Sequence, residues 1–261
     1  MNILNEIVKR TRQRIEEQKK IISPEKCMET AFSYNIDSNF LFEKALRSKD
    51  IAFICEIKKA SPSKGIIAEN FDYISIAKDY EKAGAAAISV LTEPYYFLGN
   101  NRYLTEISEE VSIPLLRKDF IIDPYMIYEA KVLGASAVLL ICSILDEKSL
   151  AEYIKIADSL GLSTLVETHD KNEVKTALNA SARIVGVNNR NLKTFEIDMS
   201  LTKHLKKMVN DDIIFVSESG IRTPEDIEKL REIGGDAALI GESIMRADDK
   251  KAEITRLRGI I

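Results

Sequence analysis

The stretch Ile51-Ala-Phe-Ile-Cys-Glu-Ile-Lys-Lys-Ala-Ser-Pro-Ser-Lys-Gly65 is a nearly continuous apolar run that charged residues interrupt before it breaks at a Ser-Pro pair. Such a run is typical of a parallel strand buried on both faces, so charges near its C-terminal end need a reason. Alternation along a strand places Glu56 and Lys58 on the side opposite Ile57. If that side is the interior of a barrel, an acid-base pair enters one cavity. The alternative is a buried structural ion pair.

Seven further apolar runs follow, separated by segments with a helical period. The eight expected strands are 51–57, 86–91, 114–118, 137–141, 163–167, 184–188, 213–218 and 237–240. The expected helices between them are 74–82, 124–133, 150–160, 172–179, 201–208 and 224–233. Alternating strands and helices in a chain of 261 residues predict an α/β protein with a single (β/α)₈ TIM barrel, because open sheets more often have about five or six strands.

The first 48 residues precede the first expected strand and are predicted to form a helical extension of the barrel. Apolar side chains such as Ile3, Ile7 and Ile15 recur with a helical period, and Ser23-Pro24 is expected to end this helix. A second short helix is expected at 40–47. No linker divides the chain, so residues 1–261 are predicted to form one catalytic domain with residues 1–48 as its N-terminal extension.

Composition and charge exclude several classes of function. The formal net charge of −4 argues against a nucleic-acid or membrane-surface binder. The odd, widely spaced cysteines Cys27, Cys55 and Cys142 favour a reducing cytoplasmic setting. With only two histidines and no Cys-x-x-Cys motif, a metal site is not expected. No signal peptide or membrane-spanning run is recognised, and no obligate protein partner is inferred.

Polar residues follow seven of the eight expected strands, where barrel enzymes have their active sites. In chain order these strand ends carry Glu56, Lys58 and Ser61; Thr92 and Glu93; Arg117, Lys118 and Asp119; Glu167, Thr168 and His169; Asn188, Asn189, Arg190 and Asn191; Ser217, Glu218 and Ser219; and Gly241, Glu242 and Ser243. Each alone could be a loop residue, a helix cap or a turn. Because the strand ends converge on one rim, together they predict an active site.

The last two strand ends predict a phosphate site. Ser219-Gly220 and Gly241-Glu242 offer backbone N–H donors where barrel enzymes commonly bind phosphate, with a helix N-terminus to assist. The alternative is that these glycines only form tight turns. The predicted ligand is therefore a small phosphorylated molecule.

Several motifs also resemble those of indole-3-glycerol phosphate synthase, an enzyme family of tryptophan biosynthesis. The signature stretch is Glu56-Ile-Lys-Lys-Ala-Ser-Pro-Ser-Lys64. Further segments that agree in order and spacing are Leu91-Thr-Glu-Pro-Tyr-Tyr-Phe97, Leu116-Arg-Lys-Asp-Phe120, Leu165-Val-Glu-Thr-His169, Gly186-Val-Asn-Asn-Arg-Asn-Leu192, Ser217-Glu-Ser-Gly220 and Leu239-Ile-Gly-Glu-Ser243. The resemblance covers nearly the whole chain. It implies conversion of 1-(2-carboxyphenylamino)-1-deoxyribulose 5-phosphate into indole-3-glycerol phosphate, carbon dioxide and water, with no cofactor or metal.

The resemblance also implies roles for individual residues. Lys118 would be the general acid at the substrate ketone and Glu167 the base for later proton removal. Lys58 would act near the departing hydroxyl, with Glu56 setting its charge. Asn188 and Arg190 would hold the substrate hydroxyl and carboxylate, and Glu218 would complete the polar wall. The phosphate would be bound by the backbone N–H groups of Ser219, Gly220, Gly241 and Glu242, with Lys58 or Ser61 nearby. The aromatic ring would lie between Pro62, Phe97, Phe120, Leu139, Leu192 and Leu239.

Glu242 departs from those members of the family that have serine or threonine at this position, so only its backbone is an expected phosphate ligand. The loop around Phe97 also varies within the family. A related barrel enzyme, phosphoribosylanthranilate isomerase, would be expected to use a cysteine-aspartate pair instead. A non-catalytic phosphate-binding barrel would be expected to lack Lys118, Glu167 or Lys58, and all three are present. The N-terminal helix is a candidate cover for the substrate.

Overall fold

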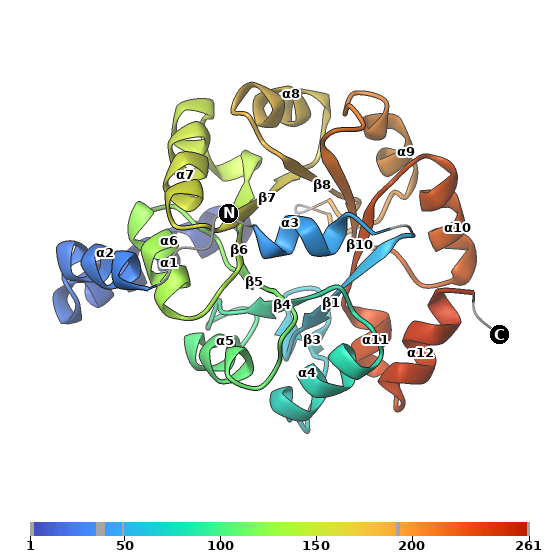
Figure 1. The fold of residues 1–261 in the computed structure, drawn as a ribbon, viewed down its shortest axis with the longest axis horizontal. Helices are drawn as coiled ribbons and strands as arrows, with labels where there is room; N and C mark the ends of the chain where they lie inside the picture. Colours follow the sequence, from blue (N-terminus) through green and yellow to red (C-terminus); the bar gives the residue numbers. More distant parts are fainter. Residues whose placement is uncertain (1–2, 35–39, 49, 192–193, 260–261) are drawn as a thin grey trace.

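A computed structural model describes residues 3–34, 40–48, 50–191 and 194–259 of the chain. Eight parallel strands close into a barrel in the order β1-β10-β9-β8-β7-β6-β5-β4, and helices surround it (Figure 1). These strands are β1 (Ala52–Ile57), β4 (Ala87–Leu91), β5 (Leu115–Lys118), β6 (Ala137–Ile141), β7 (Ser163–Thr168), β8 (Ile184–Asn188), β9 (Ile214–Glu218) and β10 (Ala237–Ile240). The predicted (β/α)₈ barrel with an N-terminal helical segment is confirmed, and each strand lies within one residue of its expected bounds.

The helices around the barrel follow the strands in sequence. They are α4 (Tyr73–Lys82), α5 (Asn101–Ser108), α6 (Pro124–Val132), α7 (Glu147–Ser159), α8 (Lys171–Asn179), α9 (Ser200–Lys206), α10 (Pro224–Glu232), α11 (Glu242–Arg246) and α12 (Lys250–Leu257), with a short 3-10 helix η1 (Cys142–Ile144) after β6. Helices α5, α11 and α12 were not among those expected. Also unexpected is a small antiparallel hairpin of β2 (Ala60–Ser61) and β3 (Gly65–Ile66) in the loop after β1.

Alternation along the strands sorts the core into two layers. One cluster fills the barrel interior with side chains such as Ile54, Leu116 and Leu165. The other, which includes Cys55 and Ile57, packs between the barrel and the surrounding helices. Glu56 lies between these two residues and therefore points inward, as the period of two predicts.

The N-terminal extension consists of α1 (Ile3–Ile21), α2 (Pro24–Ser33) and α3 (Leu41–Leu46). Helix α1 ends just before Ser23-Pro24, as expected, but the same pair also begins α2, which was not expected. The Ser23 side chain accepts a hydrogen bond from the N–H of Lys26, and proline occupies the first turn. Helix α3 lies across the barrel in Figure 1, where Phe42 and Leu46 join the interior cluster.

Two further expectations concern cysteines and membranes. Cys27, Cys55 and Cys142 are all buried, and all three are free thiols. Of the helices in the described part of the chain, none has the length and apolar character needed to cross a bilayer.

Candidate active site

A cavity opens at the C-terminal ends of the strands, the rim that the sequence singled out. Its lining contains the following predicted site residues: Glu56, Lys58, Ser61, Pro62, Phe97, Lys118, Phe120, Leu139, Glu167, Asn188, Arg190, Glu218, Ser219, Gly220, Leu239, Gly241 and Glu242. Leu192 lies outside the described residues. The structure thus brings these side chains to one place, while their individual roles stay predictions.

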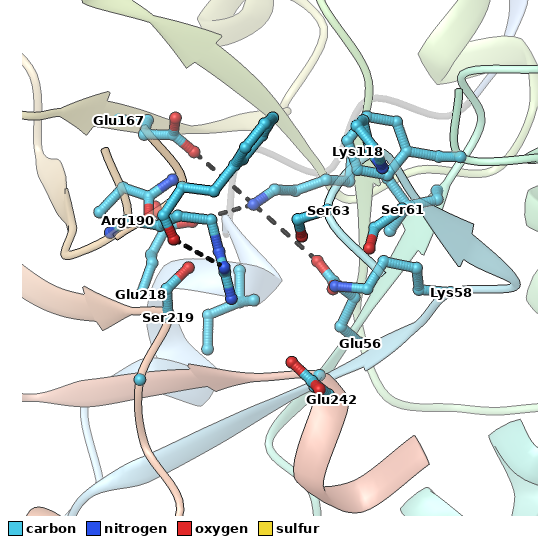
Figure 2. A pocket seen from close by; sticks show the side chains of 18 of the residues that line it. Glu56, Lys58, Ser61, Ser63, Lys118, Glu167, Arg190, Glu218, Ser219 and Glu242 are labelled. Carbon is cyan, nitrogen blue, oxygen red and sulfur yellow. Dashed lines mark hydrogen bonds and ion pairs between the residues drawn. The ribbon is translucent and has the colours of Figure 1, made fainter. Parts of the chain in front are cut away.

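Lys118, the last residue of β5, reaches into the middle of a group of carboxylates from three other strands (Figure 2). Its Nζ lies 2.9 Å from Glu218 Oε2, 3.6 Å from Glu167 Oε2 and 3.9 Å from Glu56 Oε2. Lys58 donates a hydrogen bond from its Nζ to the other oxygen of Glu56. Both lysines therefore contact Glu56, and Lys118 also links Glu56 to Glu167 and Glu218.

The charges of this group shift each other's pKa values. Burial opposes the positive charge of Lys118, but the three carboxylates outweigh that effect and raise its pKa above the ordinary value, so Lys118 is cationic. Burial likewise opposes ionisation of Glu56, but the ammonium groups of Lys58 and Lys118 lower its pKa. Glu218 behaves differently: burial, with Glu167 and Glu56 as neighbours, raises its pKa to about 7 despite Lys118. Glu218 therefore exchanges a proton near neutral pH.

A glycine in the adjacent strand makes room for Glu218. Gly186 of β8 has no side chain, and a Cβ atom placed there would lie 2.3 Å from Glu218 Oε1. That oxygen is buried and accepts no hydrogen bond from any described residue. An unpaired buried oxygen is costly, and it favours the protonated form of this carboxyl group.

The two asparagines at the end of β8 have different surroundings. Asn188 lines the cavity, and its Oδ1 accepts a hydrogen bond from the backbone N–H of Arg190. Asn189 instead donates to the backbone oxygens of Glu218 and Ser219 and accepts from Thr202, so it links β8 to β9. Asn188 can therefore contact a ligand, whereas Asn189 has a structural position.

Aromatic rings form one wall of the cavity. Phe97 and Phe120 are in contact, with ring centroids 6.0 Å apart. The loop that carries Phe97 is held by buried Glu93, whose carboxylate accepts hydrogen bonds from the backbone N–H groups of Tyr95, Tyr96 and Phe97. Glu93, noted at a strand end in the sequence, thus supports the loop rather than the chemistry.

Helix α1, the candidate cover for the substrate, contributes side chains to the cavity, although no motif of the family resemblance lies in it. Ile3, Leu4 and Ile7 line the cavity. The helix is bound to the loop after β5, because Arg14 Nη2 lies 3.0 and 2.9 Å from the two carboxylate oxygens of Asp119. The apolar stripe noted at 3–15 was the available signal, but it did not tell whether the stripe faces the barrel rim or a helix.

Asp119 and Ser243, both noted at strand ends in the sequence, also line the cavity. The other lining residues were not predicted site residues: Ser63, Ile67, Leu91, Ile141, Phe195, Ile197, Ile221, Arg222 and Ile240. Phe195 also accepts a hydrogen bond from Arg190 Nη1 at its backbone oxygen, 3.2 Å away, so the loop after β8 orients that guanidinium group. Within the described ranges, no group of three or more His, Cys, Asp or Glu residues could hold a metal ion.

The predicted phosphate site combines the end of β9 with the start of α11. Ser219 and Gly220 have φ angles of 63° and 92°, a conformation that favours glycine. A Cβ atom at Gly220 would also lie 2.4 Å from Met199 Sδ. The Glu242 carboxylate is paired, with Oε1 3.6 Å from Lys64 Nζ and 3.5 Å from Arg246 Nε.

Comparison with known proteins points to one family. A family model described as indole-3-glycerol phosphate synthase matches residues 4–257. The chain is 60% identical over 257 residues to the indole-3-glycerol phosphate synthase of Ruminiclostridium cellulolyticum, covering 98% of this chain and 99% of the relative. It is 51% identical to that of Endomicrobium trichonymphae with the same coverage. A solved 3-hexulose-6-phosphate synthase has a TM-score of 0.63 at 15% identity, covering 81% of this chain and 100% of that one, which shows the fold alone.

Proposed function

Since the chain belongs to the indole-3-glycerol phosphate synthase family, we propose how its residues carry out that reaction. The enzyme is a carboxy-lyase of tryptophan biosynthesis. It converts 1-(2-carboxyphenylamino)-1-deoxyribulose 5-phosphate into indole-3-glycerol phosphate, carbon dioxide and water. One observation supports the assignment of roles: Lys118 lies within 4 Å of carboxylates from three other strands, beside an aromatic wall.

Ring closure is assigned to Lys118. The ring carbon that carries the carboxylate attacks the ketone carbon, and Lys118 gives a proton to the ketone oxygen as negative charge develops there. Because the lysine is cationic and surrounded by carboxylates, it also stabilises that charge before the proton moves. Phe97 and Phe120 hold the arene against its electrophile, and Arg190 binds the carboxylate. Loss of carbon dioxide then restores the aromatic ring.

Dehydration is assigned to Glu167 and Lys58. The new hydroxyl group leaves as water with a proton from Lys58, while Glu167 takes a proton from the neighbouring carbon. Figure 2 shows Lys58 and Glu167 on opposite sides of the cavity, with Lys118 between Glu167 and Glu56. An acid and a base separated in this way can act on two sides of one substrate.

Phosphate binding is assigned to the backbone N–H groups at 219–220 and 241–242. Their position at a helix start and in a left-handed turn favours an anion. Ser61 lines the same cavity and can add a hydroxyl donor. The paired carboxylate of Glu242 leaves its backbone N–H as the group that contacts phosphate.

We further propose that the enzyme works in the cytoplasm. The presence of free, buried thiols at Cys27, Cys55 and Cys142 supports a reducing setting. Thiol titration of protein unfolded without reductant should find all three free. A disulfide in freshly isolated protein would contradict this proposal.

The activity is tested by giving the purified chain the ribulose 5-phosphate derivative and following indole fluorescence. The chain contains no tryptophan, so product emission is separate from the signal of its nine tyrosines. We expect turnover without added metal or cofactor. No turnover from well-folded protein would overturn the assignment.

A further inference from the structure

His169, which follows β7, has no part in the mechanism above, yet it lies beside the proposed base. Its Nε2 is 3.4 Å from Glu167 Oε1, is buried, and makes no hydrogen bond of good geometry with any described residue. Its Nδ1 is 3.1 Å from Glu173 Oε2 in α8, and the same oxygen accepts the His169 backbone N–H at 2.7 Å. The Glu173 carboxylate thus holds the His169 ring on the side that faces away from Glu167.

These contacts limit the protonation state of the ring. A carboxylate only accepts hydrogen bonds, so Nδ1 must carry the proton that is donated to Glu173. In the neutral ring Nε2 would then present a lone pair to the Glu167 carboxylate, which is repulsive. In the imidazolium form Nε2–H points at Glu167 instead. The geometry therefore favours the charged ring.

The charged groups around His169 also favour the imidazolium form of its ring. Glu167 of β7, Glu173 of α8 and Glu218 of β9 face it, while Lys118 of β5 lies beyond Glu167. Burial lowers the pKa of His169, but the hydrogen bond to Glu173 and the charges of the three carboxylates outweigh burial and raise it. The thiol of Cys142 donates to the Glu173 backbone oxygen, with its own pKa raised by burial to about 12, so it stays neutral.

We propose that His169 is a positioning residue for the reaction: as an imidazolium held by Glu173, it donates Nε2–H to Glu167 and fixes the orientation of that carboxylate. Lys118 Nζ lies on Oε2 of Glu167 and His169 Nε2 lies on Oε1, so a cation holds each oxygen. When Lys118 gives up its proton, His169 still holds the base in place. The proposal rests on the function proposed above, because it takes Glu167 as the base.

The first test needs no turnover. The chain has two histidines, so NMR titration of the ring signals gives two curves, and His204→Gln, exposed on α9, assigns them. We expect His169 to titrate above the ordinary value of about 6.5 and to shift downward in both Glu173→Gln and Glu167→Gln. An ordinary value that neither variant changes would overturn the proposal.

The second test is kinetic. In the wild type, kcat should fall as pH rises through the pKa of His169, because the Nε2–H is lost. His169→Ala should lower kcat about tenfold with little change in KM, since a misplaced base affects the transition state. His169→Gln keeps a neutral donor, so it should lose less activity and lack the alkaline decline that depends on this ring. His204→Gln is the matched control.

The possible results distinguish a positioning role of His169 from a purely structural one. If His169→Gln keeps the wild-type kcat and pH profile, His169 is structural and the proposal is wrong. If the histidine variants do not fold, Glu173→Gln provides the same kinetic test from the other side of the ring. If the wild type shows no turnover, the proposed function fails, and NMR still decides whether His169 is coupled to Glu167.

Discussion

The two ends of the barrel are built from the same eight strands, yet their interiors differ in kind. At the N-terminal end, inward residues such as Ala52 and Ile184 meet Phe42 and Leu46 of α3 in an apolar cluster. At the C-terminal end the inward residues include a charged group, Glu56, Glu167 and Glu218 with Lys118 at its centre. Burying an ion costs several kcal/mol even after relaxation, so the charged end does not exist for stability.

The comparison teaches that alternation fixes which side chains enter the barrel, whereas position along the strand decides what they do. Leu165 and Glu167 are two residues apart in β7, so both side chains point inward. The first belongs to the apolar cluster and the second to the cavity. Substitutions at the charged C-terminal end should therefore lower activity, whereas substitutions at the apolar N-terminal end should lower stability.

Lys118→Ala breaks the charged end most directly. We expect kcat to fall by about 10²–10⁴-fold, because the placed acid and its charge are lost in the transition state. Affinity for the product should change by less than about tenfold. Single-turnover fluorescence and equilibrium binding separate the two effects. Lys155→Ala, exposed on α7, is the matched control. Equal losses of binding and turnover would instead identify Lys118 as a ground-state anchor.

Phe42→Ala breaks the apolar end. Phe42 is fully buried against the barrel interior, so truncation should lower the free energy of unfolding by about 3–5 kcal/mol. Well below the melting temperature, kcat/KM should stay within about twofold of the wild type, because the cavity lies at the other end. Urea unfolding and steady-state kinetics measure the two quantities. Phe32→Ala on α2, where the side chain is 46% exposed, should cost much less stability. A large loss of kcat/KM in folded Phe42→Ala would contradict the separation of the ends.

Glu218→Gln tests whether the charged end lowers stability. The folded protein holds a proton on Glu218 up to about pH 7, whereas the unfolded chain releases it near 4.5. This contribution to stability is present at low pH and is lost as pH rises through about 7. The wild type should therefore lose on the order of 3 kcal/mol relative to Glu218→Gln between about pH 4 and pH 8. Urea unfolding of both proteins across this range measures it, with exposed Glu232→Gln as control. Parallel curves would show that Glu218 does not exchange this proton.

Gly186→Ala disturbs the charged end without removing a charge. The added Cβ would lie 2.3 Å from Glu218 Oε1, so the carboxylate must move away from its position beside Lys118. We expect kcat to fall about tenfold. In the Glu218→Ala background the clash is gone, and the same substitution should have little further effect. Additive losses would mean that Gly186 acts through another neighbour, such as Leu165.

Much of the barrel, including which side chains point inward, could be predicted from the sequence, because it depends on local patterns. Apolar runs separated by segments with a helical period predicted the strands to within one residue, and the period of two placed Glu56 inward. Helix α2 was not predicted, since a Ser-Pro pair that ends one helix can also begin the next. The hairpin β2–β3 was missed because its two-residue strands are too short to show a period.

The distances within the site could not be predicted in the same way. Lys118 and Glu218 are 100 residues apart, and their contact depends on how the barrel closes. The resemblance to a family indicated the residues, but the raised pKa of Glu218 follows from burial and from the neighbouring carboxylates Glu167 and Glu56, which come from other strands. Likewise, His169 stood beside Glu167 in the motif, while its orientation toward Glu173 needed the turn into α8.

Glu242→Gln should have the smallest effect, because it lies at the rim of the charged end, where solvent screens charge. Its carboxylate is paired with Lys64 of the β1 loop and with Arg246, and the side chain is 25% exposed. Exposed ion pairs contribute about 0–1 kcal/mol, so stability should hardly change. Removing a negative charge near the phosphate site and freeing two cations should lower KM by about two- to fivefold, and added salt should reduce the difference. Initial rates at low and high ionic strength measure this, again with Glu232→Gln as control. A higher KM would mean that Glu242 chiefly orders the loop through Lys64, so that the pair matters more for shape than for charge.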